Sequence, residues 1–295
     1  MARFAHRSRP LRRRHLAVRV AALLVLALAG LAGWGLIMAR SDPVVRRVTL
    51  IVDGFPRGTP PLRLALVSDI HVGNWAMPAS RLERIVDQIN AQAPDAVLIA
   101  GDLVNGGVPD SKRFNAEAFV APLSRLQAPL GVWASLGNHD VDTRPREVTA
   151  ALTRAHAHVL SNRAVRLGPI TLIGQEYDHL LRPIAPRIMA SAIELGGVPV
   201  LMSHAPPDPH AVPAGVALVL AGHTHCGQIL LGPWDNSWDP FSGERRFDPR
   251  FRCGLVHTPH YTIVIGAGLG AASEIPLRIN APPDVWMITL VPRDQ

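Results

Sequence analysis

Side chains that bind divalent metals follow five separate apolar stretches of this 295-residue chain. Asp69 and His71 follow 62–68, Asp102 follows 96–100, Asn138 follows 131–136, His204 follows 198–203, and His223 and His225 follow 216–221. Short apolar runs of this length predict buried strands. Ligands of open α/β sheets bind at the carboxyl ends of the strands. We therefore expect the seven side chains to converge at one edge of a sheet.

Carboxylate, amide and neutral imidazole groups together suit divalent cations such as those of Mn, Fe, Zn or Co. Seven candidate ligands are too many for one tetrahedral site, whereas a bridging carboxylate would allow two sites. Two ions about 3.5–4 Å apart around a shared water form the arrangement that phosphoryl chemistry uses. The sequence therefore predicts two divalent metal ions and leaves their identity open.

Glycines stand beside three of the candidate ligands, at positions 101, 137 and 222. A glycine permits the sharp turn and the close backbone approach that such a loop needs. Taken singly, Gly101-Asp102 or Gly137-Asn138 would predict only an ordinary turn. The motifs taken together, each after an apolar run, favour a metal site.

The residues between these motifs predict the strands and helices that position them. In 79–91, Leu82, Ile85, Val86 and Ile89 have the spacing of one helix face. Further helices are expected at 115–126, 144–155 and 186–194, and further strands at 48–52, 170–174, 261–265 and 285–291. Strands that alternate with helices indicate an α/β or α+β fold. Residues 232–252, rich in Gly, Pro and aromatic residues, are expected to form a long loop.

The segment 20–38 contains 19 residues without a charge, close to the length that a membrane-spanning helix needs. Seven arginines precede it, and positive residues stay on the cytoplasmic side. We therefore expect a basic cytoplasmic segment at 1–19, a transmembrane helix or signal anchor at 20–38, a linker and edge strand at 39–60, and the main domain at 61–295 outside the cytoplasm. A cleaved signal peptide and a twin-arginine export signal at Arg12-Arg13-Arg14-His15-Leu16 stay open as alternatives.

Charge and composition exclude several classes of protein. The chain carries a net charge of +7, but the first 47 residues alone carry +9, so the remainder is nearly neutral. A nucleic-acid-binding domain would have its basic surface on the folded part, so we expect no nucleic acid partner. A chain that is 48% hydrophobic and 18% charged is not disordered.

The two cysteines and one glycine-rich motif carry weaker signals. Cys226 and Cys253 are too few for a disulfide-rich scaffold, and a disulfide between them stays open. The segment 266–271 fits a dinucleotide-binding pattern, but too few residues follow it for a βαβ unit. We expect a tight loop there.

The ordered motifs resemble those of a known family. Asp69-x-His71, Gly101-Asp102, Gly137-Asn138-His139-Asp140, His204 and Gly222-His223-Thr224-His225 are similar to the five motifs of the calcineurin-like metallophosphoesterases, over about 48–291. Gly227-Gln228-Ile229, Gly268-Leu269-Gly270 and the apolar N-terminal segment most resemble the bacterial membrane-associated or exported phosphodiesterase branch. The resemblance implies a four-layer α/β/β/α sandwich of two mixed sheets flanked by helices, with a dinuclear metal centre. It also implies a single-pass protein of the bacterial inner membrane.

The resemblance also implies roles for individual residues. One metal would be held by Asp69, His71 and His225, the other by Asn138, His204 and His223, and Asp102 would bridge them. His139 would contact the phosphate or protonate the leaving oxygen, with Asp140 orienting its imidazole. A hydroxide between the metals would attack a phosphate ester, which we expect to be a diester derived from lipid or cell wall. A pyrophosphatase of a UDP-linked lipid A precursor and a non-catalytic metal-binding scaffold are the alternatives.

Overall fold

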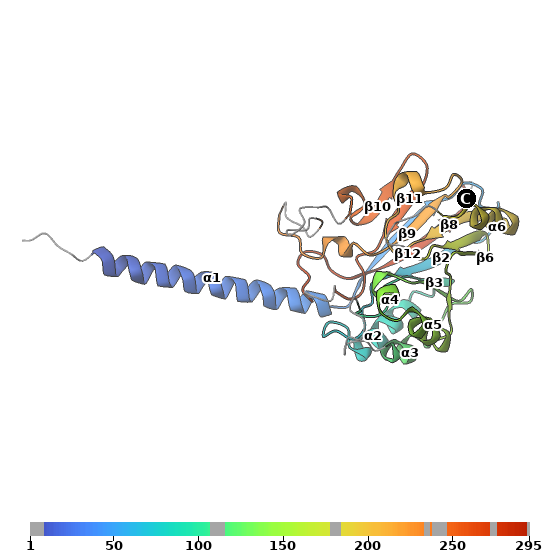
Figure 1. The fold of residues 1–295 in the computed structure, drawn as a ribbon. Coiled ribbons are helices and arrows are strands. Elements are labelled where there is room, and N and C mark those ends of the chain that lie inside the picture. Colours follow the sequence, from blue (N-terminus) through green and yellow to red (C-terminus); the bar gives the residue numbers. More distant parts are fainter. Residues whose placement is uncertain are drawn as a thin grey trace, which may run out of the picture.

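The computed structural model describes residues 9–106, 116–177, 184–232, 237, 247–271 and 276–293, with the side chains described from residue 14. Two six-stranded mixed sheets form the domain (Figure 1). The first sheet has the order β1 (Val44–Ile51), β12 (Asp284–Val291), β2 (Leu62–Val67), β3 (Ala96–Ala100), β4 (Val132–Ser135) and β5 (Ala157–Val159). The second has the order β10 (Gly254–His257), β11 (Thr262–Ile265), β9 (Leu218–Ala221), β8 (Val198–Met202), β7 (Ile170–Gly174) and β6 (Arg163–Leu167).

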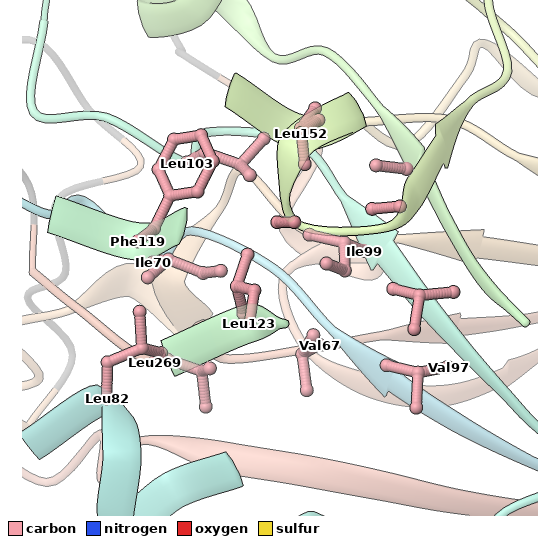
Figure 2. Packing of buried hydrophobic residues seen from close by; sticks show 14 of the residues in the cluster. Val67, Ile70, Leu82, Val97, Ile99, Leu103, Phe119, Leu123, Leu152 and Leu269 are labelled. Atoms are coloured by element: carbon pink, nitrogen blue, oxygen red, sulfur yellow. The ribbon is translucent and has the colours of Figure 1, made fainter. Parts of the chain in front are cut away.

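Helices cover the outer faces of the two sheets. They are α2 (Ala79–Asn90), α3 (Glu117–Leu123), α4 (Asn138–Thr143), α5 (Pro145–Arg154) and α6 (Pro186–Leu195). A buried cluster joins α2, α3 and α5 to the first sheet (Figure 2). A second cluster fills the space between the sheets, and a third lies between α6 and the second sheet. The expected four-layer α/β/β/α sandwich is confirmed.

Strand β2 illustrates why the sheets are covered on both faces. Its successive side chains point to opposite faces, as in any strand. Ala65 and Val67 belong to the cluster under the helices, whereas Leu64 and Leu66 belong to the cluster between the sheets. A strand buried on both faces is continuously apolar, which is the signal that the sequence carries at each central strand.

The parallel strands place their carboxyl ends at one edge of the sandwich. Strands β2, β3, β4 and β5 are parallel in the first sheet, and β7, β8, β9 and β11 are parallel in the second. Backbone hydrogen bonds continue past these ends, from Asp69 N to Gly101 O at 2.9 Å and from Gly222 N to His204 O at 2.9 Å. We call this end of the domain the site edge.

Some elements differ from the sequence-based expectations. Strands β5, β6 and β10 and helix α4 were not expected, because none of them carries a buried apolar run. Strand β6 contains Arg163 and Arg166 and lies at the end of its sheet with most of its residues partly exposed. Strand β1 is an edge strand as expected, but it begins at Val44 rather than at 48. Most of the expected loop at 232–252 lies outside the described residues.

The N-terminal helix α1 (Arg9–Arg40) projects from the domain (Figure 1). Its part from Arg14 to Arg40 is the one helix among the described residues that is long and apolar enough to cross a membrane. Almost all of this apolar surface is exposed in the isolated chain, in contrast to a core helix.

Replacing Leu152 with alanine tests the helix-covered core. Leu152 on α5 is fully buried among the residues of Figure 2. We expect Leu152→Ala to lower the free energy of unfolding by about 2–5 kcal/mol, because it leaves a cavity. Leu195→Ala is the matched control, since Leu195 on α6 is 41% exposed. Chemical unfolding of the full chain in detergent measures both, and equal losses would contradict this packing.

Candidate metal centre

The seven predicted metal-binding side chains all lie at the site edge and point toward one another. Asp69, His71 and His225 form one group whose ligand atoms lie within 4.8 Å of one another. The Nε2 atoms of His71 and His225 are 3.2 Å apart, and Oδ1 of Asp69 is 3.4 Å from Nε2 of His225. These three residues are buried, so this group is the inner half of the centre.

Asp102, His204 and His223 form a second group at the same edge. Oδ2 of Asp102 is 3.3 Å from Nε2 of His204, which in turn lies 3.1 Å from Nδ1 of His223. The amide oxygen of Asn138 completes this group at 3.0 Å from Nε2 of His204. Asn138 and His223 are only partly buried, so this half is the more open one.

Asp102 lies between the two groups. Its Oδ2 is also 3.7 Å from Nε2 of His71, and Asp102 and His71 form a third group with His139. The other oxygen, Oδ1, accepts a hydrogen bond from the backbone N–H of His139 at 2.9 Å. Asp102 is therefore the carboxylate that is placed to serve both halves of the centre.

The electrostatics of the cluster favour the binding of positive charge. Burial lowers the pKa of His71 and of His223 to about 3, so both imidazoles are neutral at pH 7 and have a lone pair to offer. Burial would raise the pKa of Asp102, but the charge and hydrogen bond of His204 outweigh burial and hold it below its usual range. Burial would likewise lower the pKa of His204, but Asp102 outweighs it and raises that pKa to about 9.

This donor set fits divalent cations. Two buried carboxylates, an amide oxygen and several neutral imidazoles converge, and such groups are ligands of Mn, Fe, Zn and Co. The negative charges of Asp102 and Asp69 favour positive charge here, since both raise the pKa of His204. The residues present therefore fit a metal centre.

The backbone at the site edge is held in an uncommon conformation. Five of the seven side chains belong to residues with positive φ, between 50° and 69°: Asp69, His71, Asp102, His223 and His225. Residues other than glycine adopt this region rarely, at a cost of about 1–3 kcal/mol each. Each such residue turns the chain sharply as a strand ends, which directs the side chain into the shared volume.

Gly137 illustrates the close approach that the sequence predicted. A Cβ atom built there would overlap Oδ1 of Asp102 and stand 2.8 Å from its Cγ. Any side chain at position 137 would therefore displace the carboxylate that joins the two groups.

The structure corrects the role expected for Asp140. Its carboxylate accepts hydrogen bonds from the backbone N–H groups of Leu103, Val104 and Gly137 at 2.9–3.1 Å, and so holds two of the site loops together. The imidazole of His139 is oriented instead by the carbonyl oxygen of Gly106, 2.8 Å from Nδ1. Burial and the nearby charge of Asp102 raise the pKa of Asp140 to about 7.

Sequence reasoning missed residues that support the metal-binding side chains. Ser68 donates a hydrogen bond to Oδ2 of Asp69 at 2.5 Å. Arg278, which is fully buried, places Nη2 3.2 Å from Nδ1 of His225. Ser68 ends an apolar run and so had a weak signal, whereas Arg278 lies 53 residues from His225 in a segment without a motif. The segment 266–271 is the expected tight loop, with Gly270 N donating to Asp69 O at 2.7 Å.

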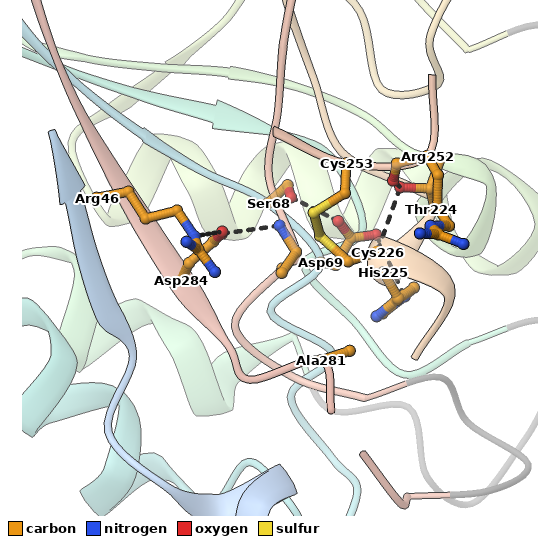
Figure 3. The surroundings of a disulfide bond; sticks show 12 residues. Arg46, Ser68, Asp69, Thr224, His225, Cys226, Arg252, Cys253, Ala281 and Asp284 are labelled. Carbon is orange, nitrogen blue, oxygen red and sulfur yellow. Dashed lines mark hydrogen bonds and ion pairs between the residues drawn. A yellow bond between two sulfur atoms is a disulfide. The ribbon is translucent and has the colours of Figure 1, made fainter. Parts of the chain in front are cut away.

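A disulfide joins Cys226, next to the ligand candidate His225, to Cys253, one residue before β10 (Figure 3). Their Cα atoms are 4.7 Å apart. Nearby, Oγ1 of Thr224 donates to the carbonyl oxygen of Arg252 at 2.6 Å. These links fasten the segment that carries His223 and His225 to the outer strand of the second sheet.

A cavity of about 390 Å³ opens beside the partly buried half of the centre. His223 forms part of its wall together with Tyr177, Phe247 and Phe251. The ring of Tyr177 lies 5.8 Å from that of His204 and 6.1 Å from that of His223. The open half of the centre therefore adjoins a space with aromatic walls.

Replacing Gly137 with alanine tests the close packing around Asp102. We expect Gly137→Ala to lose most of its bound divalent metal, measured by elemental analysis, while thermal unfolding stays cooperative. Overpacking of this kind costs about 1–3 kcal/mol. Gly30→Ala in α1 is the control, because a Cβ there meets nothing within 4 Å. Full metal content in Gly137→Ala would show that Asp102 is not held as described.

Two known proteins are similar to this chain in sequence over most of its length. An uncharacterized metallophosphoesterase of Helicobacter pylori is 29% identical over 278 residues, which cover 92% of this chain and 70% of that protein. A transmembrane protein with metallophosphoesterase domain from Danio rerio is 30% identical over 294 residues, which cover 92% of this chain and 63% of that protein.

Among solved structures, an archaeal phosphodiesterase has a TM-score of 0.37 at 12% identity, covering 70% of this chain and 84% of that one. The Pseudomonas putida nuclease MPE has a TM-score of 0.36 at 18% identity, covering 70% and 74%. In sequence, residues 62–227 match the family described as calcineurin-like phosphoesterase, and this range includes all seven metal-binding candidates and His139. The chain belongs to this family and is a metal-dependent phosphoester hydrolase.

Proposed function

We propose that this chain is a membrane-anchored phosphodiesterase that works with two divalent metal ions. The observation that carries the proposal is the position of Asp102, whose carboxylate lies between two groups of metal-binding side chains. A single metal ion would leave one of these two groups of side chains without a cation. Two ions with a shared carboxylate account for all seven side chains.

The two groups divide the proposed ligands. Asp69, His71 and His225 would hold one ion in the buried half. Asn138, His204 and His223 would hold the other in the open half, and Asp102 would bind both. When bound, such ions neutralise charge on the phosphate and lower the pKa of a water molecule.

His139 is suited to protonate the leaving oxygen. Because the carbonyl oxygen of Gly106 can only accept a hydrogen bond, Nδ1 of His139 carries the hydrogen, and Nε2 is left for a substrate. Nε2 lies 4.0 Å from Oδ2 of Asp102, and the side chain is 17% exposed. A proton on Nε2 would therefore be delivered at the rim of the metal centre, where general acid catalysis needs it.

The cavity beside His223 supports an ester rather than free phosphate as the substrate. A diester carries an organic group on each side of the phosphate, and this space could receive one of them. Its walls include Tyr177, Phe247 and Phe251, which offer apolar contact, and Arg250, which is paired with Asp248.

The N-terminal helix supports membrane anchoring with the domain outside the cytoplasm. Its apolar part is of spanning length. Seven arginines precede it, and arginine-rich flanks remain in the cytoplasm. The disulfide between Cys226 and Cys253 supports the same orientation, because disulfides persist in oxidising compartments. For a bacterial chain this is the outer side of the inner membrane.

Two substitutions separate metal binding from proton transfer. We expect Asp102→Ala and His139→Ala each to reduce hydrolysis of bis-p-nitrophenyl phosphate with Mn²⁺ by at least about 100-fold. For His139 this is the usual size of a general-acid contribution, and for Asp102 it follows from the loss of metal. Only Asp102→Ala should lose metal, because His139 is not a proposed ligand. Asp102→Asn keeps the shape of the side chain and controls for misfolding. Metal content that is unchanged in both Asp102 variants would refute the bridging role.

Reporter fusions after residue 60 and after residue 293 test the orientation. We expect alkaline phosphatase, which is active only outside the cytoplasm, to be active at both positions, and a cytoplasmic reporter to be inactive. The opposite result would place the domain inside the cell. A cytoplasmic domain would favour the alternative function, a pyrophosphatase of a nucleotide-linked lipid precursor, over an exported phosphodiesterase.

A further inference from the structure

Helix α1 enters the domain at the site edge. Strand β1 begins at Val44, which pairs with Asp284 at the start of β12. Because β12 runs antiparallel to β2, the start of β1 lies at the carboxyl end of β2, where Asp69 follows. In Figure 1, α1 leaves the domain at one end.

The connection between α1 and β1 is short and held in place. Ser41, Asp42 and Pro43 span at most about 11 Å when extended. The buried Arg81 of α2 donates to the carbonyl oxygen of Ser41 at 2.7 Å, and Gln88 donates to that of Pro43 at 2.9 Å. The domain is therefore fixed close to the end of α1 rather than carried on a flexible linker.

A loop of the domain packs alongside the last turns of α1. The backbone N–H of Arg278 donates to the carbonyl oxygen of Gly35 at 3.1 Å, and a Cβ atom on Gly35 would lie 3.4 Å from Ile279. Gly35 precedes Arg40 by five residues, about 7.5 Å along the helix axis. Since the apolar segment of α1 continues to Met38, this loop reaches the level of the bilayer interface.

The same loop contacts the metal centre. Nη2 of Arg278 lies 3.2 Å from Nδ1 of His225, and its Nε donates to the carbonyl oxygen of Gly270 at 2.7 Å. One residue thus touches α1 through its backbone and a metal-ligand candidate through its side chain. The centre cannot lie far from the bilayer that α1 spans.

Exposed side chains at this edge suit the lipid–water interface. Trp75 is 53% exposed, and the guanidinium carbon of Arg40 lies 4.6 Å from the centre of its ring. Leu231 is 44% exposed, next to Leu230, whose N–H donates to Ile279 O at 2.9 Å. Tryptophan is enriched at the headgroup level of membrane proteins, and an arginine near a helix end can bury its apolar stem there while its charged group stays in water.

We propose that the site edge faces the bilayer, with Arg40, Trp75 and Leu231 in the headgroup layer, and that the substrate is a membrane amphiphile whose phosphoester lies in that layer. This inference rests on the proposed function for its chemistry. Hydrolysis adds one water molecule across a P–O bond. The phosphate keeps the new oxygen, and the leaving alcohol keeps its own oxygen and gains a proton.

Site-specific labelling tests the position of the edge without reference to activity. The two native cysteines are bonded to each other, so a thiol-reactive fluorophore would attach only to an introduced cysteine. We would label Trp75→Cys and Ile51→Cys in the full chain, reconstituted in vesicles of phosphatidylethanolamine and phosphatidylglycerol. Ile51 is 60% exposed and lies at the other end of β1, about 23 Å from Val44.

We expect lipids with a nitroxide headgroup to quench the label at position 75 at least about twice as strongly as the label at position 51, because collisional quenching requires contact at the bilayer surface. Circular dichroism and thermal unfolding check that both variants fold. Equal quenching at the two positions would overturn the proposal that the site edge faces the bilayer.

The substrate class is tested with two p-nitrophenyl phosphodiesters and Mn²⁺ in the same vesicles. One has a long acyl chain that inserts into the bilayer, and the other is the soluble bis-p-nitrophenyl phosphate. We expect Trp75→Glu to lower the ratio of embedded to soluble hydrolysis about fivefold, since one charge near an anionic surface contributes about 1 kcal/mol. Ile51→Glu should leave this ratio at its wild-type value.

The outcomes separate this inference from the function on which it rests. Hydrolysis of the soluble diester without hydrolysis of the embedded one would overturn the substrate class and leave the phosphodiesterase intact. Hydrolysis of neither, with strong quenching at position 75, would refute the phosphodiesterase and support the membrane-facing edge. An unchanged ratio in Trp75→Glu would count against a role of this edge in presenting the substrate.

Discussion

The carboxylate of Asp102 is buried, and its two oxygens face different partners. Oδ1 accepts the amide of His139, while Oδ2 faces the imidazoles of His71 and His204. A buried carboxylate is stable only with compensating positive charge or hydrogen bonds, and here the compensation comes from groups that are themselves suited to bind metals. The other features of the site can be understood as means of bringing those groups to Asp102. Divalent ions would add positive charge beside these buried carboxylates.

Two sheets with parallel strands make this convergence possible. Loops from β2, β3 and β4 meet loops from β8 and β9 at one edge, so residues more than 150 positions apart become neighbours. The left-handed conformation of five of these residues is unfavourable in isolation. It persists because three buried clusters fix the strands on which the loops are built. The free energy of burial thus offsets the backbone strain at the centre.

The elements that carry the site could be predicted because they are the most regular parts of the sequence. Helix α2 has its apolar residues on one face, and each central strand is an unbroken apolar run followed by a polar ligand candidate.

The supporting contacts could not be predicted, because they use the backbone or distant residues. The carbonyl oxygen of Gly106 orients His139, and Arg278 reaches His225 from a segment with no motif. The family resemblance implied that Asp140 orients His139, but the turn of α4 directs the carboxylate of Asp140 to three backbone amides instead. The docking of α1 against the site edge likewise depends on tertiary contacts that hydropathy does not reveal.

The most direct measurement is anomalous X-ray scattering from crystals of the full chain grown with Mn²⁺. The account predicts two anomalous peaks about 3.5–4 Å apart, each within coordination distance of an Asp102 oxygen. Asp69, His71 and His225 should surround one peak, and Asn138, His204 and His223 the other. A single peak would contradict the account, and so would two peaks that are not both within coordination distance of Asp102.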